Sequence, residues 1–295
     1  MKNKKITIFL IVLLSLVSIS LIIFMISLLS GKLKIAKFQF GHKVSSELVL
    51  NETYDNKFKD ISITSQASDI YIKKSSMDNV KVVIYGDEEN TEVDVSENEL
   101  VINSKEKSCI GFCFNTTIAK IEVYLPENYE NNIKIVNNYG DIDVSKFLQA
   151  TIDIEEDSGD VNILGGDFVT VSNDYGDIKI DKANVIDIKQ SSGDVKVKTV
   201  NEATILNNYG DIEITTVNNY LDLSNDCGDI KIDNINLTQN STIKDDLGDI
   251  KIGSTNKIYI DAETELGDVS ITNNYPKSDI LLKIENDCGD IKVDN

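Results

Sequence analysis

Residues 207–214 read Asn-Asn-Tyr-Gly-Asp-Ile-Glu-Ile, and this stretch contains the unit that decides the fold. Its Gly-Asp pair recurs along the second half of the chain at intervals of 17 to 22 residues. A short and nearly constant period indicates stacked units, none of which can bury its apolar face alone. The glycines of the nine copies are Gly140, Gly159, Gly176, Gly193, Gly210, Gly228, Gly248, Gly267 and Gly289.

Each copy predicts two strands joined at a corner. With the glycine as position zero, positions +2 and +4 are Ile or Val in all nine copies, and positions −7 and −5 are Ile, Val or Leu in fifteen of eighteen cases. Alternation with a period of two is typical of a strand with one buried face. Stacking these units in register predicts an all-β fold, a single-chain parallel β-helix (solenoid) of about nine to ten rungs roughly 4.8 Å apart.

The corner residues have predicted roles. Gly permits a positive φ or a close backbone approach, and the polar residues at −2 are expected to hydrogen-bond the turn. Position −1 alternates between large and small in the first five rungs, as Tyr139, Ser158, Tyr175, Ser192 and Tyr209. Outward tyrosines would form a stripe for stacking on glycans. A corner filled by large beside small residues is the favoured interpretation, because packing commonly produces such patterns.

The chain before Gly140 predicts a degenerate rung and a cap. Ser68-Asp69-Ile70 fits the repeat without its glycine, and segments 80–84, 93–95, 100–102 and 118–125 are expected to form hairpins over one end. At the other end the chain stops two residues after its last strand position, which predicts an open C-terminal rung available for self-association. We expect a β cap over 55–135 and repeats over 136–295.

A membrane anchor is predicted at the N-terminus. Ile6 to Leu29 contains no charge, and at 1.5 Å per residue it is long enough for a tilted helix to cross a bilayer. Residues 1–5 would be a cytoplasmic tail and 30–54 a linker. The basic N-terminus places the C-terminal domain outside the cytoplasm of a single-pass membrane protein.

Composition excludes several functions. The net charge of −20 and the absence of arginine disfavour nucleic-acid binding. His42 is the only histidine and lies in the predicted linker, so a histidine-based triad or metal site is not expected. The prominent carboxylates all belong to the repeat, whereas a catalytic site should interrupt it. We therefore predict no enzyme, no catalytic residue and no cofactor.

Calcium is the one metal that the repeat suggests. The weak candidates are Asp160, Asp177, Asp194, Asp211 and Asp229, all at position +1, where stacked carboxylates would repel unless a cation lay between them. Lysine at +3 on five rungs shares the same strand face and offers an internal neutralisation. Turn aspartates of structural role are therefore preferred over calcium ligands.

The four cysteines predict different states. Cys109 and Cys113 are close enough to form a small disulfide loop in an oxidising compartment. Cys227 and Cys288 would lie three rungs, about 14 Å, apart in a stack built in sequence order, too far for a bond. These two are expected to be buried thiols.

Together these features resemble the bacterial envelope family named "putative adhesin", β-strand-repeat proteins of unknown function. The resemblance rests on the anchor, on the strand Val123-Tyr124-Leu125-Pro126 and on the Gly-Asp-Ile array, and it covers about residues 55–295. It implies an extracytoplasmic β-helix, in some members associated with cell-envelope stress systems.

The expected function is therefore that of a non-enzymatic envelope surface, scaffold or sensory accessory module. Its expected partners are the membrane and an envelope protein or glycan. The alternative is a calcium-stabilised adhesin that binds glycan or protein, and a polysaccharide-active enzyme ranks below both.

Overall fold

The computed structural model describes residues 43–55, 58–86, 88–105 and 117–294. Residues 43–295 form one compact unit. No helix in the described ranges is long and apolar enough to span a bilayer. The predicted anchor, Ile6 to Leu29, lies outside these ranges, as do His42 and the Cys109–Cys113 pair.

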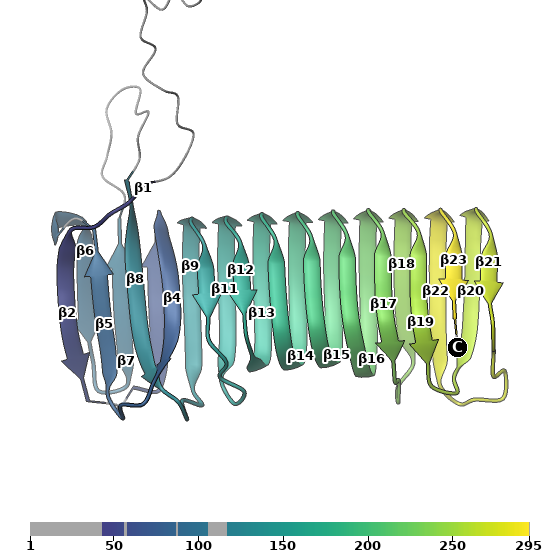
Figure 1. Ribbon diagram of the computed structural model, residues 1–295, viewed down its shortest axis with the longest axis horizontal. Helices are drawn as coiled ribbons and strands as arrows, with labels where there is room; N and C mark the ends of the chain where they lie inside the picture. Colours follow the sequence, from purple (N-terminus) through teal and green to yellow (C-terminus); the bar gives the residue numbers. More distant parts are fainter. Residues whose placement is uncertain (1–42, 56–57, 87, 106–116, 295) are drawn as a thin grey trace, which may run out of the picture. The chain divides into compact units, whose positions relative to one another are not determined.

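The unit is almost entirely β-structure, stacked along one long axis (Figure 1). Its N-terminal strands are β1 (Lys43–Val44), β2 (Leu48–Tyr54), β3 (Asp60–Ser65), β4 (Ser68–Ser75), β5 (Val80–Tyr85), β6 (Thr91–Val95), β7 (Glu99–Ser104) and β8 (Thr117–Pro126), with a single turn of 3-10 helix at Glu88–Asn90. The middle strands are β9 (Asn132–Tyr139), β10 (Ile142–Val144), β11 (Thr151–Ser158), β12 (Val161–Ile163), β13 (Gly166–Tyr175), β14 (Ile178–Ser192), β15 (Val195–Tyr209) and β16 (Ile212–Cys227). The last strands are β17 (Ile230–Ile235), β18 (Ser241–Leu247), β19 (Ile250–Thr255), β20 (Tyr259–Leu266), β21 (Val269–Ile271), β22 (Leu281–Cys288) and β23 (Ile291–Val293).

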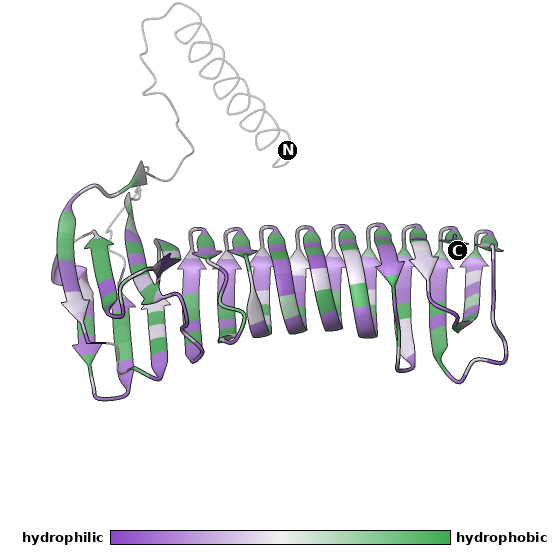
Figure 2. Ribbon diagram, turned by 60° about the horizontal axis from the view of Figure 1, so that its bottom comes forward, coloured by the Kyte–Doolittle hydropathy of each residue, from purple (hydrophilic) through white to green (hydrophobic). Residues whose placement is uncertain are grey.

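The repeats form a parallel solenoid, as the sequence predicts. Position +2 of one rung pairs with +2 of the next, as in Ile178 with Val195 and Val195 with Ile212. The side chains at +2, +4, −7 and −5 are buried in nearly every rung and form one continuous core. Green and purple bands alternate along the strands in Figure 2, because successive side chains point into the core and out to solvent.

Repeat length affects the segment that carries the chain from one rung to the next. In three of the four repeats whose glycines are 17 or 18 residues apart, a single strand (β14, β15 or β16) runs from one corner to the next without a loop, and in the fourth two residues, 164–165, separate β12 from β13. Longer repeats place loops there, as at residues 236–240 and 272–280. The extra residues thus leave the glycine corners in register and change only the opposite side of the stack, where the chain passes from one rung to the next.

The N-terminal region contains the predicted degenerate rung and antiparallel strands. Ile70 pairs with Ile142 and Ile61 with Ile133, which places β3 and β4 as a rung without glycine. Beyond it β5 pairs antiparallel with β2 and β8, and β6 antiparallel with β7. Strands β1 and β2 lie within the predicted linker 30–54, so the folded unit begins earlier than the sequence indicates.

The stacking order departs from the sequence order at the C-terminal end. Strand β22 pairs with β18 on one side and β20 on the other, and β23 lies likewise between β19 and β21. The last repeat is therefore the penultimate rung, between the rungs of Gly248 and Gly267 (Figure 1). The prediction of an open C-terminal rung was wrong in its residues, because the nine-residue loop 272–280 is long enough to carry the chain back one rung.

Candidate functional site

The Gly-Asp corners stack along one edge of the solenoid, and they fix the positions of the side chains on that edge. At Gly210 φ is +132°, and a Cβ atom would lie 2.1 Å from the carbonyl oxygen of Gly193 on the neighbouring rung. A side chain would therefore be both strained and in collision. Because the glycine of each rung stacks against the glycine of the neighbouring rung, the residues at −3, at −1 and at +1 form three columns along the stack.

The outer column, at +1, is a ladder of aspartates. In each rung one carboxylate oxygen accepts a hydrogen bond from the backbone N–H of the aspartate on the next rung, over 2.8–3.1 Å. The order runs Asp69, Asp141, Asp160, Asp177, Asp194, Asp211, Asp229, Asp249, Asp290 and Asp268. The aspartates at +1 thus have a structural role, and each side chain satisfies a backbone donor on its neighbour.

Lysines at +3 neutralise part of this column. Lys196 lies 3.0 Å from Asp194 and Lys179 lies 3.9 Å from Asp177. Burial raises the pKa of Asp194, but the N–H of Asp211 and the ammonium of Lys196 outweigh it, so the pKa lies below its usual value. The predicted neutralisation from within occurs on these rungs. Lys231 and Lys292 turn instead to the aspartates at +5, Asp233 and Asp294.

The calcium candidates Asp160, Asp177, Asp194, Asp211 and Asp229 all belong to this ladder, with one oxygen already bonded to the neighbouring backbone. No group of three or more possible metal-ligating side chains occurs in the described part of the chain. The ladder therefore offers a cation only single carboxylate oxygens spaced along an edge, whereas a hard cation such as calcium takes six to eight oxygen ligands at one site.

The inner column, at −3, was missed by the sequence reasoning, which assigned hydrogen bonding of the turn to position −2. Amide side chains here are buried and donate to glycine carbonyl oxygens, for example Asn207 to Gly210 at 3.0 Å and Asn173 to Gly159 at 3.1 Å. Thr264 does the same through its hydroxyl, to Gly289. Nine polar residues form the column: Asn137, Glu156, Asn173, Gln190, Asn207, Asn225, Asp245, Asn286 and Thr264. A polar residue three positions before every glycine was the available signal, although the sequence does not show that most of these residues are buried.

Two carboxyl groups interrupt the inner column. Glu156 is 3 % exposed and lies between Asn137 and Asn173, while Asp245 is 2 % exposed and lies between Asn225 and Asn286. Burial raises the pKa of Glu156 to about 8 and that of Asp245 to about 7. A protonated carboxyl can donate as the amides do, so both groups fit the column in their neutral form.

The residues at −1 form an exposed ridge along the corner edge, which we call the corner ridge. In stacking order it reads Tyr139, Ser158, Tyr175, Ser192, Tyr209, Cys227, Leu247, Cys288 and Leu266. Large and small residues alternate through all nine rungs, whereas in sequence order the alternation fails at its end. The inserted last repeat restores it.

The large residues of the corner ridge point into solvent. Tyr175 and Tyr209 are 63 % and 62 % exposed, and Leu266 is 71 % exposed. The favoured prediction, that these side chains fill a packed corner, was wrong, because the −3 side chains occupy the interior of the corner. The alternation of the strand stops there, and the −1 side chain points outward instead of continuing it. The ridge presents a large side chain every second rung, about 9.6 Å apart by strand spacing.

Cys227 and Cys288 also lie on the corner ridge. They are two rungs apart, with Leu247 between them, and not three as the sequence order predicts. About 9.6 Å between backbones is still too far for a disulfide. Cys227 is partly exposed and Cys288 is exposed, so the prediction of buried thiols was wrong.

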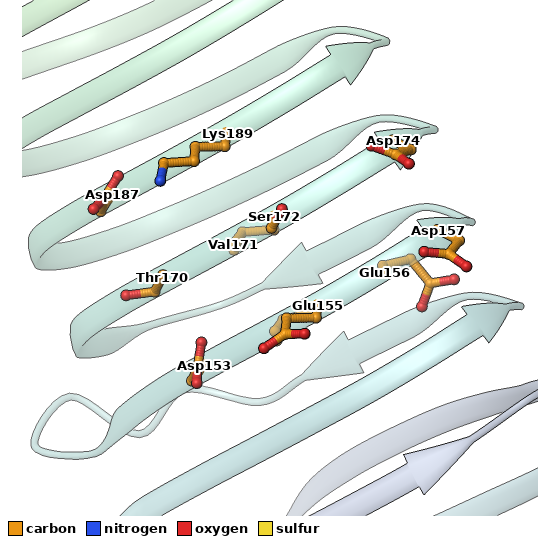
Figure 3. Close-up of a pocket in the computed structure, with 11 residues that line it drawn as sticks. Asp153, Glu155, Glu156, Asp157, Thr170, Val171, Ser172, Asp174, Asp187 and Lys189 are labelled. Carbon is orange, nitrogen blue, oxygen red and sulfur yellow. The ribbon is translucent and has the colours of Figure 1, made fainter.

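A shallow acidic groove crosses the outer face of β11, β13 and β14 (Figure 3). Asp153 and Asp187 lie in register on either side of Thr170, and Glu155 lies two strands from Lys189. These are repeat positions on the solvent side of three strands. No histidine or cysteine is among the described residues that line the groove, and the groove has the character of a solvated charged face.

No curated protein matches the chain. A solved Bacteroides fragilis protein named "putative adhesin" is 18 % identical, with a TM-score of 0.44, over 85 % of this chain and 99 % of that one. A Parabacteroides distasonis "putative lipid binding protein" is 14 % identical, with a TM-score of 0.43, over 85 % and 99 %. A Clostridium sporogenes "putative cell adhesion protein" is 13 % identical, with a TM-score of 0.25, over 83 % and 98 %.

A family model gives the more specific match. It matches this chain twice, over residues 58–185 and 181–295, which together include the degenerate rung, most of the antiparallel strands and all nine Gly-Asp rungs. The chain therefore belongs to the Toastrack DUF4097 family, whose function is unknown.

Proposed function

We propose that this protein is a non-enzymatic module of the cell envelope that meets its partner through the corner ridge. In this proposal Ile6 to Leu29 anchors the chain and the solenoid lies outside the cytoplasm. One observation supports the ridge above other surfaces: five large apolar or aromatic side chains recur on alternate rungs and are exposed. Exposed tyrosine and leucine side chains do not stabilise the fold by burial, so their repetition favours a binding role.

The regularity of the ridge suits an extended partner. Binding surfaces in solenoid proteins are built by repetition, and aromatic residues are enriched where proteins bind each other. The aspartate ladder runs beside the ridge and fixes its spacing. An envelope protein is the expected partner, so the module would serve as a scaffold or sensory accessory.

Affinity capture from intact membranes tests the proposal. The full chain and a variant with Tyr139→Ser, Tyr175→Ser and Tyr209→Ser are compared, since serine is the residue of the alternate rungs. Phe168→Ser is the matched control, because Phe168 is 50 % exposed but lies on β13 away from the ridge. A specific partner that is lost only with the ridge variant supports the proposal. Capture that is equal for all three chains contradicts it.

Anchoring is tested separately. Protease added to intact cells should degrade the solenoid, and deletion of residues 6–29 should release it from the membrane fraction. A solenoid protected from external protease would contradict the proposed location.

The alternative is a calcium-stabilised adhesin that binds glycan, with the tyrosines stacking on sugar rings. It is favoured if the captured ligand is a glycan and if capture requires calcium. Calcium titration followed by thermal unfolding addresses the metal directly, and we expect no shift at millimolar calcium. Turnover of any member of a glycan panel would contradict the non-enzymatic assignment.

A further inference from the structure

The outer end of the stack, formed by β20 and β21, is an uncovered edge. Within the described residues β20 pairs only with β22, and β21 only with β23. Val269 at position +2 is 42 % exposed and Ile271 at +4 is partly exposed. In the other Gly-Asp rungs both positions are buried, so the core itself reaches the surface here.

The backbone of β20 also faces this open side. Alternate residues of a parallel strand direct their N–H and C=O groups to opposite sides. Tyr259 donates to Ile280 on the β22 side, and the N–H of Ile260 points the other way. Ala262 and Thr264 follow Ile260 in this alternation, and within the described chain no hydrogen bond is formed by their outward backbone groups.

One side chain already occupies part of the edge as a strand would. Asn274, in the loop after β21, accepts a hydrogen bond from the N–H of Ile260 at 2.9 Å and donates to its carbonyl oxygen at 2.7 Å. An amide thus supplies at one residue the donor and acceptor of a neighbouring backbone. The outward edge of β20 can therefore pair with a further strand, and among the described residues only Ile260 is already hydrogen-bonded on that side.

Charge specifies what can pair there. Asp261, Glu263 and Glu265 point outward from β20 and are exposed. On some other rungs an outward carboxylate is paired with a lysine of the adjacent rung, as Glu285 is with Lys244 at 3.2 Å and Asp181 with Lys198 at 2.6 Å. Lys283 lies opposite Asp261 on β22, but it pairs with Glu285 on its own strand. None of the three β20 carboxylates forms an ion pair within the described residues. A second copy joined at this edge would bring like charges together.

We propose that this end of the solenoid binds an extended, basic segment of another protein as an added strand on β20. Apolar side chains of the segment cover Ala262, Val269 and Ile271, and its alternate lysine or arginine side chains face Asp261 and Glu263. Backbone hydrogen bonds to Ala262 and Thr264 give affinity, and the carboxylates give selectivity.

A labelled synthetic peptide of alternating valine and lysine is the probe, and its fluorescence anisotropy is measured with the full chain. A valine and glutamate peptide is the matched control and should bind at least tenfold more weakly. Glu263→Lys should weaken binding of the lysine peptide about tenfold. Glu92→Lys should leave it unchanged, because Glu92 is an exposed acid on β6, the outer strand at the other end.

Ala262→Pro removes the outward N–H and should also abolish binding, with circular dichroism confirming the fold. A peptide N-methylated on alternate residues provides the same test without changing the protein. Equal binding of the two peptides, an equal effect of Glu92→Lys, or no binding at all would overturn the proposal. So would sedimentation as a dimer that Glu263→Lys dissociates. The three serine substitutions on the corner ridge should not affect this binding, so the two proposals fail independently.

Discussion

Two columns flank the glycine corner, and they stabilise it in different ways. The inner column is buried and uses neutral donors to satisfy glycine carbonyl oxygens, as Asn207 does for Gly210. The outer column is mostly exposed and uses carboxylates to accept from backbone N–H groups, as Asp194 does from Asp211. In the exposed outer column, water can replace an acceptor that is lost by substitution. In the buried inner column, water cannot replace a lost donor. The same turn therefore tolerates change on one side and resists it on the other.

Substitution of the glycine between the columns should have the largest effect. A Cβ at Gly210 would lie 2.1 Å from the Gly193 carbonyl oxygen, at a positive φ, so Gly210→Ala should cost more than about 3 kcal/mol of unfolding free energy. Gly86→Ala is the control, because its Cβ would lie no closer than 3.4 Å to any atom. Urea unfolding measures both. Equal stabilities would contradict the close stacking of corners.

Removal of an inner donor should rank second. Asn207→Val leaves the Gly210 carbonyl oxygen buried without its donor and should cost about 1–3 kcal/mol more than Asn207→Thr. Threonine has the same shape as valine but keeps a hydroxyl donor, which Thr264 uses toward the carbonyl oxygen of Gly289 at 3.0 Å. The difference between the two variants in urea isolates the hydrogen bond. No difference would mean that the inner column does not stabilise the corner.

The inner carboxyls should make stability depend on pH. Glu156 and Asp245 have pKa values of about 8 and about 7 in the folded state, above their unfolded values, so the folded state binds more protons in between. The contribution of these two groups to stability is then greatest at acidic pH and falls as pH rises from about 4 to about 8, by at most about 1.4 kcal/mol per pH unit for each group.

Glu156→Gln and Asp245→Asn should remove this slope and raise the melting temperature at pH 9, with little change at pH 4. Glu155→Gln, an exposed neighbour of Glu156, is the control and should leave the slope intact. The groups that face Glu156 are Asn137, Asn173, Asp141 and Asp157, and those that face Asp245 are Asn225, Asn286, Asp229 and Asp246. A slope that persists in the double variant would show that another group titrates.

A change in the outer column should have the smallest effect. Asp194→Ala removes one acceptor of the Asp211 N–H and the partner of Lys196, and should cost about 1 kcal/mol or less because water reaches the site. Asp194→Asn keeps the acceptor oxygen and should cost less than half of that. Thermal unfolding compares them. A cost as large as that of Asn207→Val would remove the contrast between the columns.

Sequence reasoning succeeded where the pattern is local and repeated. The pairs Ile212 and Ile214, Ile230 and Ile232 predicted strands and a shared core, and the degenerate rung at Ser68 followed from the same offsets. It failed at Asn207 because the column at −3 differs from a surface turn only in burial. It failed at Tyr175 because exposure of a −1 side chain depends on the corner's geometry.

The spacing of Gly, Asp and the aliphatic pairs by itself determined that this chain is a solenoid, since period-two strands joined by a glycine corner have few other ways to bury their faces. Only the tertiary structure decided which rungs touch. A loop of nine residues places Gly289 against Gly248 and leaves Gly267 at the end. Pairing between rungs depends on backbone edges and loop length, and neither is encoded in the side-chain period.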